Sequence, residues 1–144
     1  IMSLLDPTKK MSKSDANPLG AIDLLDSEEQ IRRKILGAVT DSGTDIKYDP
    51  TRPGISNLLE IYSNFSGQSF IEIENKFAKK GYQEFKEDLA NLVCGELLSL
   101  QARYTQLRES GKLEKILKDG AKKAYAMSHP KLLEVYDRVG FVKS

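Results

Sequence analysis

The chain has 144 residues, 40% of them apolar, and its 22 Lys and Arg residues nearly balance 21 Asp and Glu residues, for a formal net charge of +1. This length predicts one domain, or one domain with part of a second, and the apolar content suffices for one core. The balanced charge excludes a strongly basic nucleic-acid coat but allows a local basic patch, and no DNA partner is expected. No apolar run approaches the roughly 20 residues that cross a bilayer, so no membrane partner is expected.

The cysteine and histidine content restricts the possible chemistry. Cys94 is the only cysteine, so no intrachain disulfide can form, which favours a reducing compartment and a cytoplasmic location. Its apolar neighbours, Val93 among them, predict a small core residue rather than a nucleophile. His129 is the only histidine, so neither a catalytic triad nor a histidine-rich zinc site is expected, and no metal site is predicted.

The first 26 residues differ in pattern from the rest of the chain. Residues 1–5 are mostly apolar and stop at Asp6-Pro7, which predicts the end of a buried strand. The small and charged residues that follow, up to Gly20, predict an exposed loop. Because Ile1 is not an initiator residue, we expect the chain to be part of a longer protein.

From Ser27 onward the sequence follows the helical period. Ser27 with Gln30, and Ser69 with Glu72, match the capping box that opens helices. Apolar side chains then recur three and four positions apart, and no later stretch predicts a convincing strand. The expected elements are a helix opening at Ser27, a loop at 41–54, a helix from about 58 that closes at Gly67, a short helix opening at Ser69, a long helix at 82–109, and two helices built around 113–124 and 132–139. The predicted fold class is therefore all-α, a helical bundle preceded by a strand-and-loop segment.

The loop contains the segment Lys10-Met11-Ser12-Lys13-Ser14. Two ammonium groups three positions apart, with hydroxyl groups between and after them, form a set of donors suited to phosphate oxygens. The segment has no general base or nucleophile, so it suits a reaction in which the protein positions and neutralises a polyphosphate. Taken alone, two lysines at this spacing are more often a solvated charged turn.

This segment is identical to the KMSKS signature of class I aminoacyl-tRNA synthetases, and here it follows a strand end and precedes a helical region, as in that class. The surrounding sequence resembles bacterial tryptophanyl-tRNA synthetases over essentially the whole chain, in their C-terminal part. The similar stretches are residues 1–9, Lys34-Ile35 with residues 38–42, residues 54–59, residues 120–124, Val135-Tyr136 and Gly140-Phe141.

The resemblance implies an organisation and an activity. Residues 1–26 would be the C-terminal edge of a Rossmann-type catalytic domain that otherwise lies outside the chain, and residues 27–144 the helical anticodon-recognition domain. The full-length enzyme would be a homodimer that uses ATP with Mg²⁺ to activate tryptophan and then charges tRNA(Trp). We expect the chain by itself to be inactive and to hold no ATP tightly.

The resemblance also implies roles for individual residues. In the family the KMSKS loop closes over the ATP phosphates and stabilises charge that develops on the pyrophosphate. Lys13 would make the transition-state contact, and the backbone of Ile1 would meet the adenine. The residues that would bind ATP are Ile1, Lys10, Met11, Ser12, Lys13 and Ser14.

A second group of lysines is a candidate tRNA contact. Lys115, Lys118 and Lys122 would share one face of a helix, in the region that the family uses to read the anticodon. Charged helix faces are usually only solvated, and spacing does not identify the residues that read bases.

Two alternatives remain open at this stage. The related tyrosine-specific synthetases share the catalytic architecture, although the blocks around residues 40–42 and 54–57 favour the tryptophan branch. The chain could also act as a stand-alone tRNA-binding module without catalysis.

Overall fold

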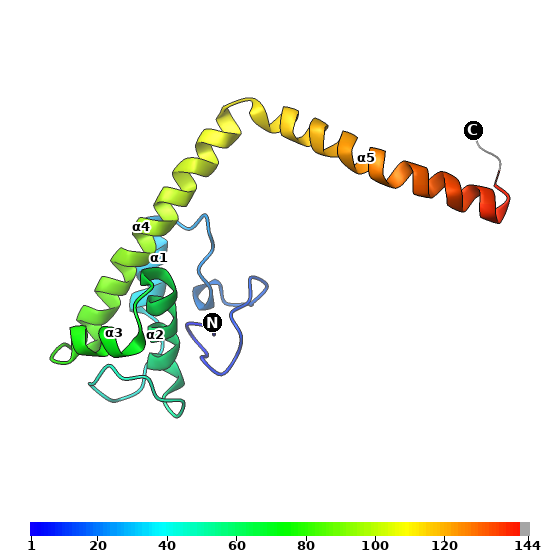
Figure 1. Ribbon diagram of the computed structural model, residues 1–144. Coiled ribbons are helices and arrows are strands. Elements are labelled where there is room, and N and C mark those ends of the chain that lie inside the picture. The colour runs from blue at the N-terminus through cyan, green and yellow to red at the C-terminus, as the bar shows by residue number, and fades with distance from the viewer. Residues whose placement is uncertain (142–144) are drawn as a thin grey trace. The chain divides into compact units, whose positions relative to one another are not determined.

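The computed structural model describes residues 1–141, and these residues form α-helices and one short 3-10 helix but no regular strand. The all-α prediction is therefore confirmed. The elements, shown in Figure 1, are the 3-10 helix Pro18–Gly20, α1 Glu28–Leu36, α2 Pro53–Ser66, α3 Phe70–Phe77, α4 Tyr82–Glu109 and α5 Lys112–Val139.

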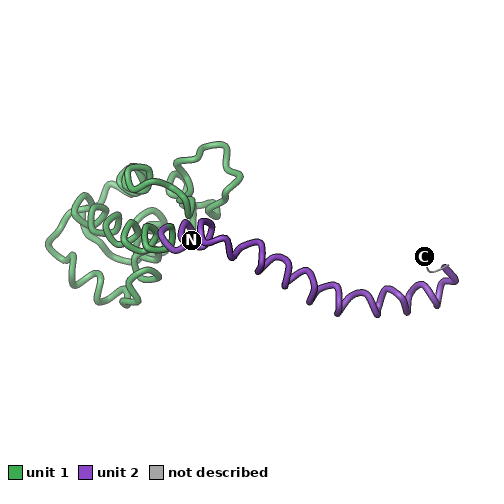
Figure 2. The backbone as a smooth tube through the Cα atoms, turned by 90° about the horizontal axis from the view of Figure 1, so that it is seen from above, with its two compact units in different colours: residues 1–101 green, residues 102–144 purple. Residues whose placement is uncertain are grey.

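The chain divides into two compact units, Ile1–Gln101 and Ala102–Ser144, coloured separately in Figure 2. The division falls within α4. The functional boundary expected between residues 26 and 27 is a different division and stays a prediction, and residues 142–144 of the second predicted domain lie outside the described part.

The strand predicted for residues 1–5 is not formed. Met2 makes only an isolated antiparallel bridge with Lys10. A strand requires a continuous ladder of hydrogen bonds to a neighbour. Here the Leu4 amide instead donates to the Gly20 carbonyl at 2.9 Å, and the Leu4 carbonyl accepts from the Val39 amide at 2.7 Å. The apolar pattern predicted burial correctly, since Leu4 is 1% exposed, but not the backbone partner.

Two helices begin at the capping boxes that the sequence predicts. The Ser27 hydroxyl accepts from the Gln30 amide, and the Gln30 side chain accepts in return from the Ser27 amide, at the start of α1. Ser69 and Glu72 make the same reciprocal pair at the start of α3. Each pair satisfies backbone donors that have no partner inside the helix, so local sequence fixes both starting points.

The start of α2 lies inside the expected loop. The helix begins at Pro53, whose missing amide proton suits the first helical position. Gly54 follows in the first turn, where a Cβ atom would lie 2.6 Å from the Val39 carbonyl oxygen. The predicted end is confirmed, because Gly67 has φ of 72° and its amide donates to the Ser63 carbonyl at 2.8 Å.

Residues 21–27 are held against α1 and α4 by an ion pair and hydrogen bonds. The Lys34 ammonium lies 2.6 Å from an Asp26 carboxylate oxygen, and both side chains are buried. The same oxygen accepts from the Asp23 amide at 2.8 Å. From α4, the Gln101 amide donates to the carbonyls of Leu24 and Asp26, each at 2.9 Å. The junction between the loop region and the helices is thus part of the first unit.

The core of the first unit is built by α1, α2, α3 and the first part of α4. Tyr62, Phe77 and Phe85 form an aromatic group in which neighbouring ring centroids lie 5.1–5.8 Å apart. Beside it, the Lys76 ammonium lies 2.6 Å from Asp88 and 2.7 Å from the Tyr62 hydroxyl. Cys94 is buried with this core, as predicted, and burial raises the pKa of its thiol.

The second unit corrects the prediction of two C-terminal helices. Residues 112–139 form one helix, α5, which continues through Pro130. None of its residues is buried, and Tyr104 and Leu107, near the end of α4, are 42% and 44% exposed. The apolar positions that the sequence assigned to a bundle core in residues 102–139 are therefore exposed or half-buried. The periodicity predicted the helical structure of this segment correctly and its burial wrongly.

Candidate functional site

The loop that carries the KMSKS residues is closed at its base by backbone hydrogen bonds. The Ser3 amide donates to the Lys9 carbonyl at 2.8 Å, and the Leu4 amide donates to Gly20 where the loop returns. Ser3 and Leu4 are both buried, so the loop leaves a fixed point on the core. Figure 1 shows it as a blue excursion beside the helices of the first unit.

A tight turn precedes the motif. The Asp6 carboxylate accepts from the Thr8 hydroxyl at 2.6 Å and from the Thr8 amide at 3.2 Å, and it pairs with the Lys9 ammonium at 2.8 Å. These contacts lower the pKa of Asp6 to about 2, and the hydrogen bond from Lys9 has the largest effect. The charge of Lys9 is thus engaged locally, and Lys9 differs in this respect from the two lysines of the motif.

The two motif lysines are exposed. Within residues 1–141, neither Lys10 nor Lys13 forms an ion pair. Between them and after them, the hydroxyls of Ser12 and Ser14 lie 3.1 Å apart, and the Ser14 amide donates to the Ser12 hydroxyl at 3.4 Å. The Asp15 amide donates to the Ser12 carbonyl at 3.3 Å and closes a turn. The motif therefore presents two ammonium groups and two hydroxyls on one short turn.

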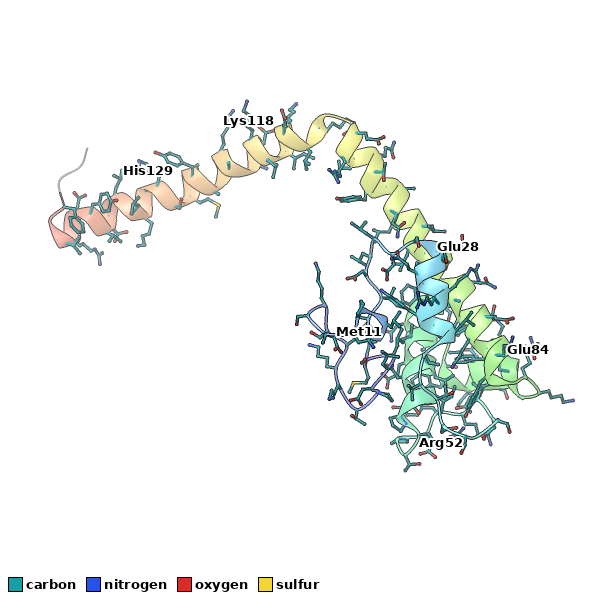
Figure 3. The ribbon with its side chains drawn as sticks, turned by 180° about the vertical axis from the view of Figure 1, so that it is seen from behind. Met11, Glu28, Arg52, Glu84, Lys118 and His129 are labelled. Carbon is teal, nitrogen blue, oxygen red and sulfur yellow. The ribbon has the colours of Figure 1, made fainter. Side chains whose placement is uncertain are left out.

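Met11 anchors the motif to the core. Its side chain is partly buried and packs against the core of the first unit, while its amide donates to the Ile1 carbonyl at 3.3 Å. Met11 is labelled on this loop in Figure 3. The structure thus brings together Ile1 and the motif, which the sequence predicted to share one ATP site; Ile1 itself is 51% exposed.

This arrangement suits binding of a polyphosphate. The ammonium groups are not engaged by carboxylates of the described residues and can contact phosphate oxygens, and the serine hydroxyls and turn amides can add hydrogen bonds. Nothing in the loop can act as a general base or nucleophile, so its chemical contribution is electrostatic.

One residue of this region was missed by the sequence interpretation. The Asn57 side chain, on α2, accepts from the Met2 amide at 2.7 Å and donates to the Met2 carbonyl at 2.9 Å. The sequence placed it in the block of residues 54–59 that resembles the family, and it is a polar residue within the apolar run of α2, but neither signal gave it a partner or a role.

The lysines proposed for tRNA all lie on α5, in the second unit. Lys115, Lys118 and Lys122 are exposed and make no ion pair with a described residue. Figure 3 labels Lys118 on α5, and His129 lies farther along the same helix. The positions of the three lysines on one helix support the shared face that was predicted.

Two further observations concern residues 1–141. No cluster of three or more His, Cys, Asp or Glu side chains there could hold a metal ion. No helix in that range is both long and apolar enough to cross a membrane.

A sequence model of the family described as "tRNA synthetases class I (W and Y)" matches residues 1–97. The chain belongs to this family. Among curated relatives of this synthetase chain, the tryptophan–tRNA ligase of Listeria innocua is 50% identical over 97% of the chain and 43% of the relative, and that of Bacillus subtilis is 46% identical with the same coverage.

Solved structures agree with this assignment. Tryptophanyl-tRNA synthetase from Mycoplasma pneumoniae matches with a TM-score of 0.81 and 32% identity, over 99% of this synthetase chain and 44% of that one. The enzyme from Campylobacter jejuni complexed with ADP and tryptophan matches with a TM-score of 0.72 and 27% identity, over 98% of this chain. The chain spans less than half the length of these relatives.

Proposed function

We propose that the chain is the C-terminal part of a tryptophan–tRNA ligase, which activates tryptophan with ATP and transfers it to tRNA(Trp). In this proposal residues 1–26 supply the ATP-binding loop and residues 27–144 supply the anticodon-binding helices. The observation that carries it is the exposed KMSKS turn on a buried base, in a chain about half identical to tryptophan–tRNA ligases.

Lys13 is proposed as the catalytic residue. When the tryptophan carboxylate attacks the α-phosphorus of ATP, the bond to the β-phosphate oxygen breaks and negative charge grows on the pyrophosphate. An ammonium group that is not already paired can stabilise that charge more in the transition state than in bound ATP. The exposure of Lys13, and the lack of a carboxylate partner among the described residues, support this role.

The other motif residues would hold the nucleotide. Lys10 would contact the phosphates, and the hydroxyls of Ser12 and Ser14 would donate hydrogen bonds to them. The backbone of Ile1 would meet the adenine beside Met11. Mg²⁺ would arrive with ATP as part of the substrate.

The remaining roles are proposed for the full-length protein. It would be a cytoplasmic homodimer whose partner is tRNA(Trp), and Lys115, Lys118 and Lys122 would contact the tRNA backbone from α5. All three lie on one exposed helix, which is compatible with phosphate contacts.

The test is Lys13→Ala in the full-length protein, assayed by tryptophan-dependent exchange of pyrophosphate into ATP. We expect kcat to fall by about 10²–10³ with a small change in the KM for ATP, because the lost contact belongs mainly to the transition state. Lys9→Ala is the matched control: it removes a lysine from the same loop, but one that is already paired with Asp6, and activity should change little. A raised KM for ATP with unchanged kcat would contradict the role of Lys13.

The two alternatives differ in support. A tyrosine-specific synthetase is compatible with a family that includes both specificities, but the similar relatives described above are tryptophan–tRNA ligases. Substituting tyrosine for tryptophan in the same exchange assay distinguishes these enzymes. A stand-alone tRNA-binding role describes what the chain by itself could do and is compatible with the ligase proposal.

A further inference from the structure

We propose that Asn57 is a positioning residue for the KMSKS loop. Its side-chain amide holds the backbone of Met2 and thereby fixes the segment on which the motif rests. The inference rests on the proposed function, because it assigns Asn57 an effect on ATP-dependent chemistry that is exerted through Lys10 and Lys13.

The contact has the form of a backbone pairing. The carboxamide of Asn57 offers one acceptor and one donor on a planar group, as a peptide unit does, and it satisfies both the amide and the carbonyl of Met2, at 2.7 and 2.9 Å. Within the described residues, the Met2 backbone is paired by this side chain on α2 and by an isolated bridge to Lys10.

Met2 lies directly beneath the motif. It bridges Lys10 in antiparallel register, and on either side of it Ser3 bonds to Lys9 and Ile1 bonds to Met11. Residues 1–3 and 9–11 are thus held together by backbone hydrogen bonds. A shift of Met2 would move the first residues of the motif with it.

The part of α2 that carries Asn57 is tightly packed. Asn57 is only 4% exposed, and its helical neighbours Ile55, Leu58 and Leu59 are each at most 1% exposed. Because α2 is packed into the core at these residues, it cannot shift together with the KMSKS loop. Asn57 therefore holds Met2 at a fixed position relative to the core. The carbonyl oxygen and the amide group of the buried Asn57 side chain are both hydrogen-bonded to Met2, as is usual for buried polar groups.

The adjacent residue provides a matched control. Ser56 is also buried on α2, and its hydroxyl also makes two backbone contacts, accepting from the Asp49 amide at 3.0 Å and donating to the Asp49 carbonyl at 2.7 Å. Ser56 therefore resembles Asn57 in burial, helix and type of contact, but it holds the loop before α2 rather than the segment beneath the motif.

The experiment compares Asn57→Ala and Ser56→Ala in the full-length protein, by pyrophosphate exchange and by thermal unfolding. Both should lower the unfolding temperature, because each removes two hydrogen bonds from half-buried backbone groups, of Met2 or of Asp49. Only Asn57→Ala should lower kcat, by about tenfold or more, since a displacement on the order of 1 Å at a reacting site costs up to about 10² in rate. Asn57→Asp, which keeps the shape and the acceptor but loses the donor, should lower kcat in the same direction and serves if the alanine variant does not fold.

A double-mutant cycle with Lys13→Ala identifies the route of the effect. If Asn57 acts through the motif, Asn57→Ala should cost less than about twofold once Lys13 is gone, because interacting residues are non-additive. An undiminished loss in that background, or equal losses of kcat in Asn57→Ala and Ser56→Ala, would overturn the inference. Lack of tryptophan-dependent exchange in the unaltered protein would instead refute the proposed function.

Discussion

Arg52 connects the loop before α2 to the start of α4. Its guanidinium donates to the Asp41 carboxylate at 2.8 and 3.3 Å, to the Asp45 carbonyl at 3.0 Å and to the Tyr82 hydroxyl at 2.6 Å. The Tyr82 hydroxyl in turn donates to Asp41 at 2.5 Å, and a Cβ atom on Gly43 would lie 2.7 Å from the guanidinium. Because Arg52 is its strongest partner, the pKa of Asp41 lies well below its ordinary value. Arg52, Asp41 and Tyr82 thus form a hydrogen-bonded cluster, and loss of one side chain leaves the other two incompletely paired.

Tyr82→Phe tests this cluster in the 144-residue chain. The variant should lose about 1.5–3 kcal/mol of unfolding free energy at neutral pH, as expected for hydrogen bonds to charged groups. Two effects raise the pKa of Tyr82 to about 12: burial of the hydroxyl, which is the larger, and its hydrogen bond to Asp41. The folded state therefore holds this proton more tightly than the unfolded state, and that contribution is present below about pH 10 and is lost as the pH rises towards 12.

Urea unfolding between pH 8 and 11 provides the measurement. Stability of the unaltered chain should fall more steeply above pH 10 than stability of Tyr82→Phe. Tyr48→Phe is the control, since Tyr48 is exposed and, among residues 1–141, its hydroxyl makes one hydrogen bond, of 3.3 Å, to Glu60. Parallel alkaline slopes for Tyr82→Phe and the unaltered chain would contradict the assignment.

At the scale of elements, the local sequence predicted where α1 and α3 begin. It did not predict that residues 112–139 form a single helix. Ser27 and Ser69 begin α1 and α3 through side chains within the first turn, so no distant contact is needed. α5 depends on local propensity in another way. None of its residues is buried, so backbone hydrogen bonds and side-chain pairs such as Lys131 with Glu134 contribute much of its stability.

Pro130→Ala should therefore increase the helicity of the 144-residue chain and raise the midpoint of its helical melting. A proline inside a helix lacks one amide donor and crowds the carbonyl four residues earlier, at a cost of about 3 kcal/mol. Circular dichroism at 222 nm against temperature measures the effect. Lys131→Ala, one position away, should change the melting little or lower it slightly through loss of the Glu134 pair. A decrease in helicity in Pro130→Ala would instead favour the two separate helices that the periodicity predicts.

At the scale of the whole molecule, the chain contains the KMSKS loop and a helical region, and it spans 43% of the length of the Listeria innocua relative. The role proposed for this loop is to bind the ATP phosphates. One such loop cannot orient ATP and an amino acid together, and orientation provides a large part of the rate enhancement of such reactions. Binding of tRNA does not require such orientation of two substrates, because exposed lysines on a single helix can bind phosphates independently of the catalytic groups.

We therefore expect the 144-residue chain to bind tRNA(Trp) weakly and to form no tryptophanyl-adenylate. With a net charge of only +1, few phosphates should be neutralised, so the slope of log K against log salt should be shallow. Alanine at Lys115, Lys118 and Lys122 together should weaken binding and reduce that slope. Alanine at Lys47, Lys79 and Lys80, an equal change of charge in the first unit, is the control.

Titration of tRNA(Trp) and of a copy with an altered anticodon, at two salt concentrations, measures both affinity and specificity. Equal affinity for the two RNAs would remove the anticodon-reading proposal and leave only electrostatic binding. Adenylate formed by the purified chain would contradict the expectation that catalysis needs the rest of the protein.

The sequence by itself determined the features that depend on neighbouring residues. It predicted the all-α class, both capping boxes, the glycine end of α2, the bounds of α4, the buried Cys94 and the exposed loop that carries Lys10 and Lys13. Each of these follows from residues within one or two helical turns, or from a contiguous motif.

The features that only the tertiary structure decided depend on contacts between distant residues. Met2 is paired by Asn57, which lies 55 positions away, and Arg52 contacts Tyr82 across 30 positions, and neither partner is identified by local pattern. Burial on α5 was mispredicted for the same reason: an apolar stripe indicates which face of a helix can be covered, but whether it is covered depends on what packs against it.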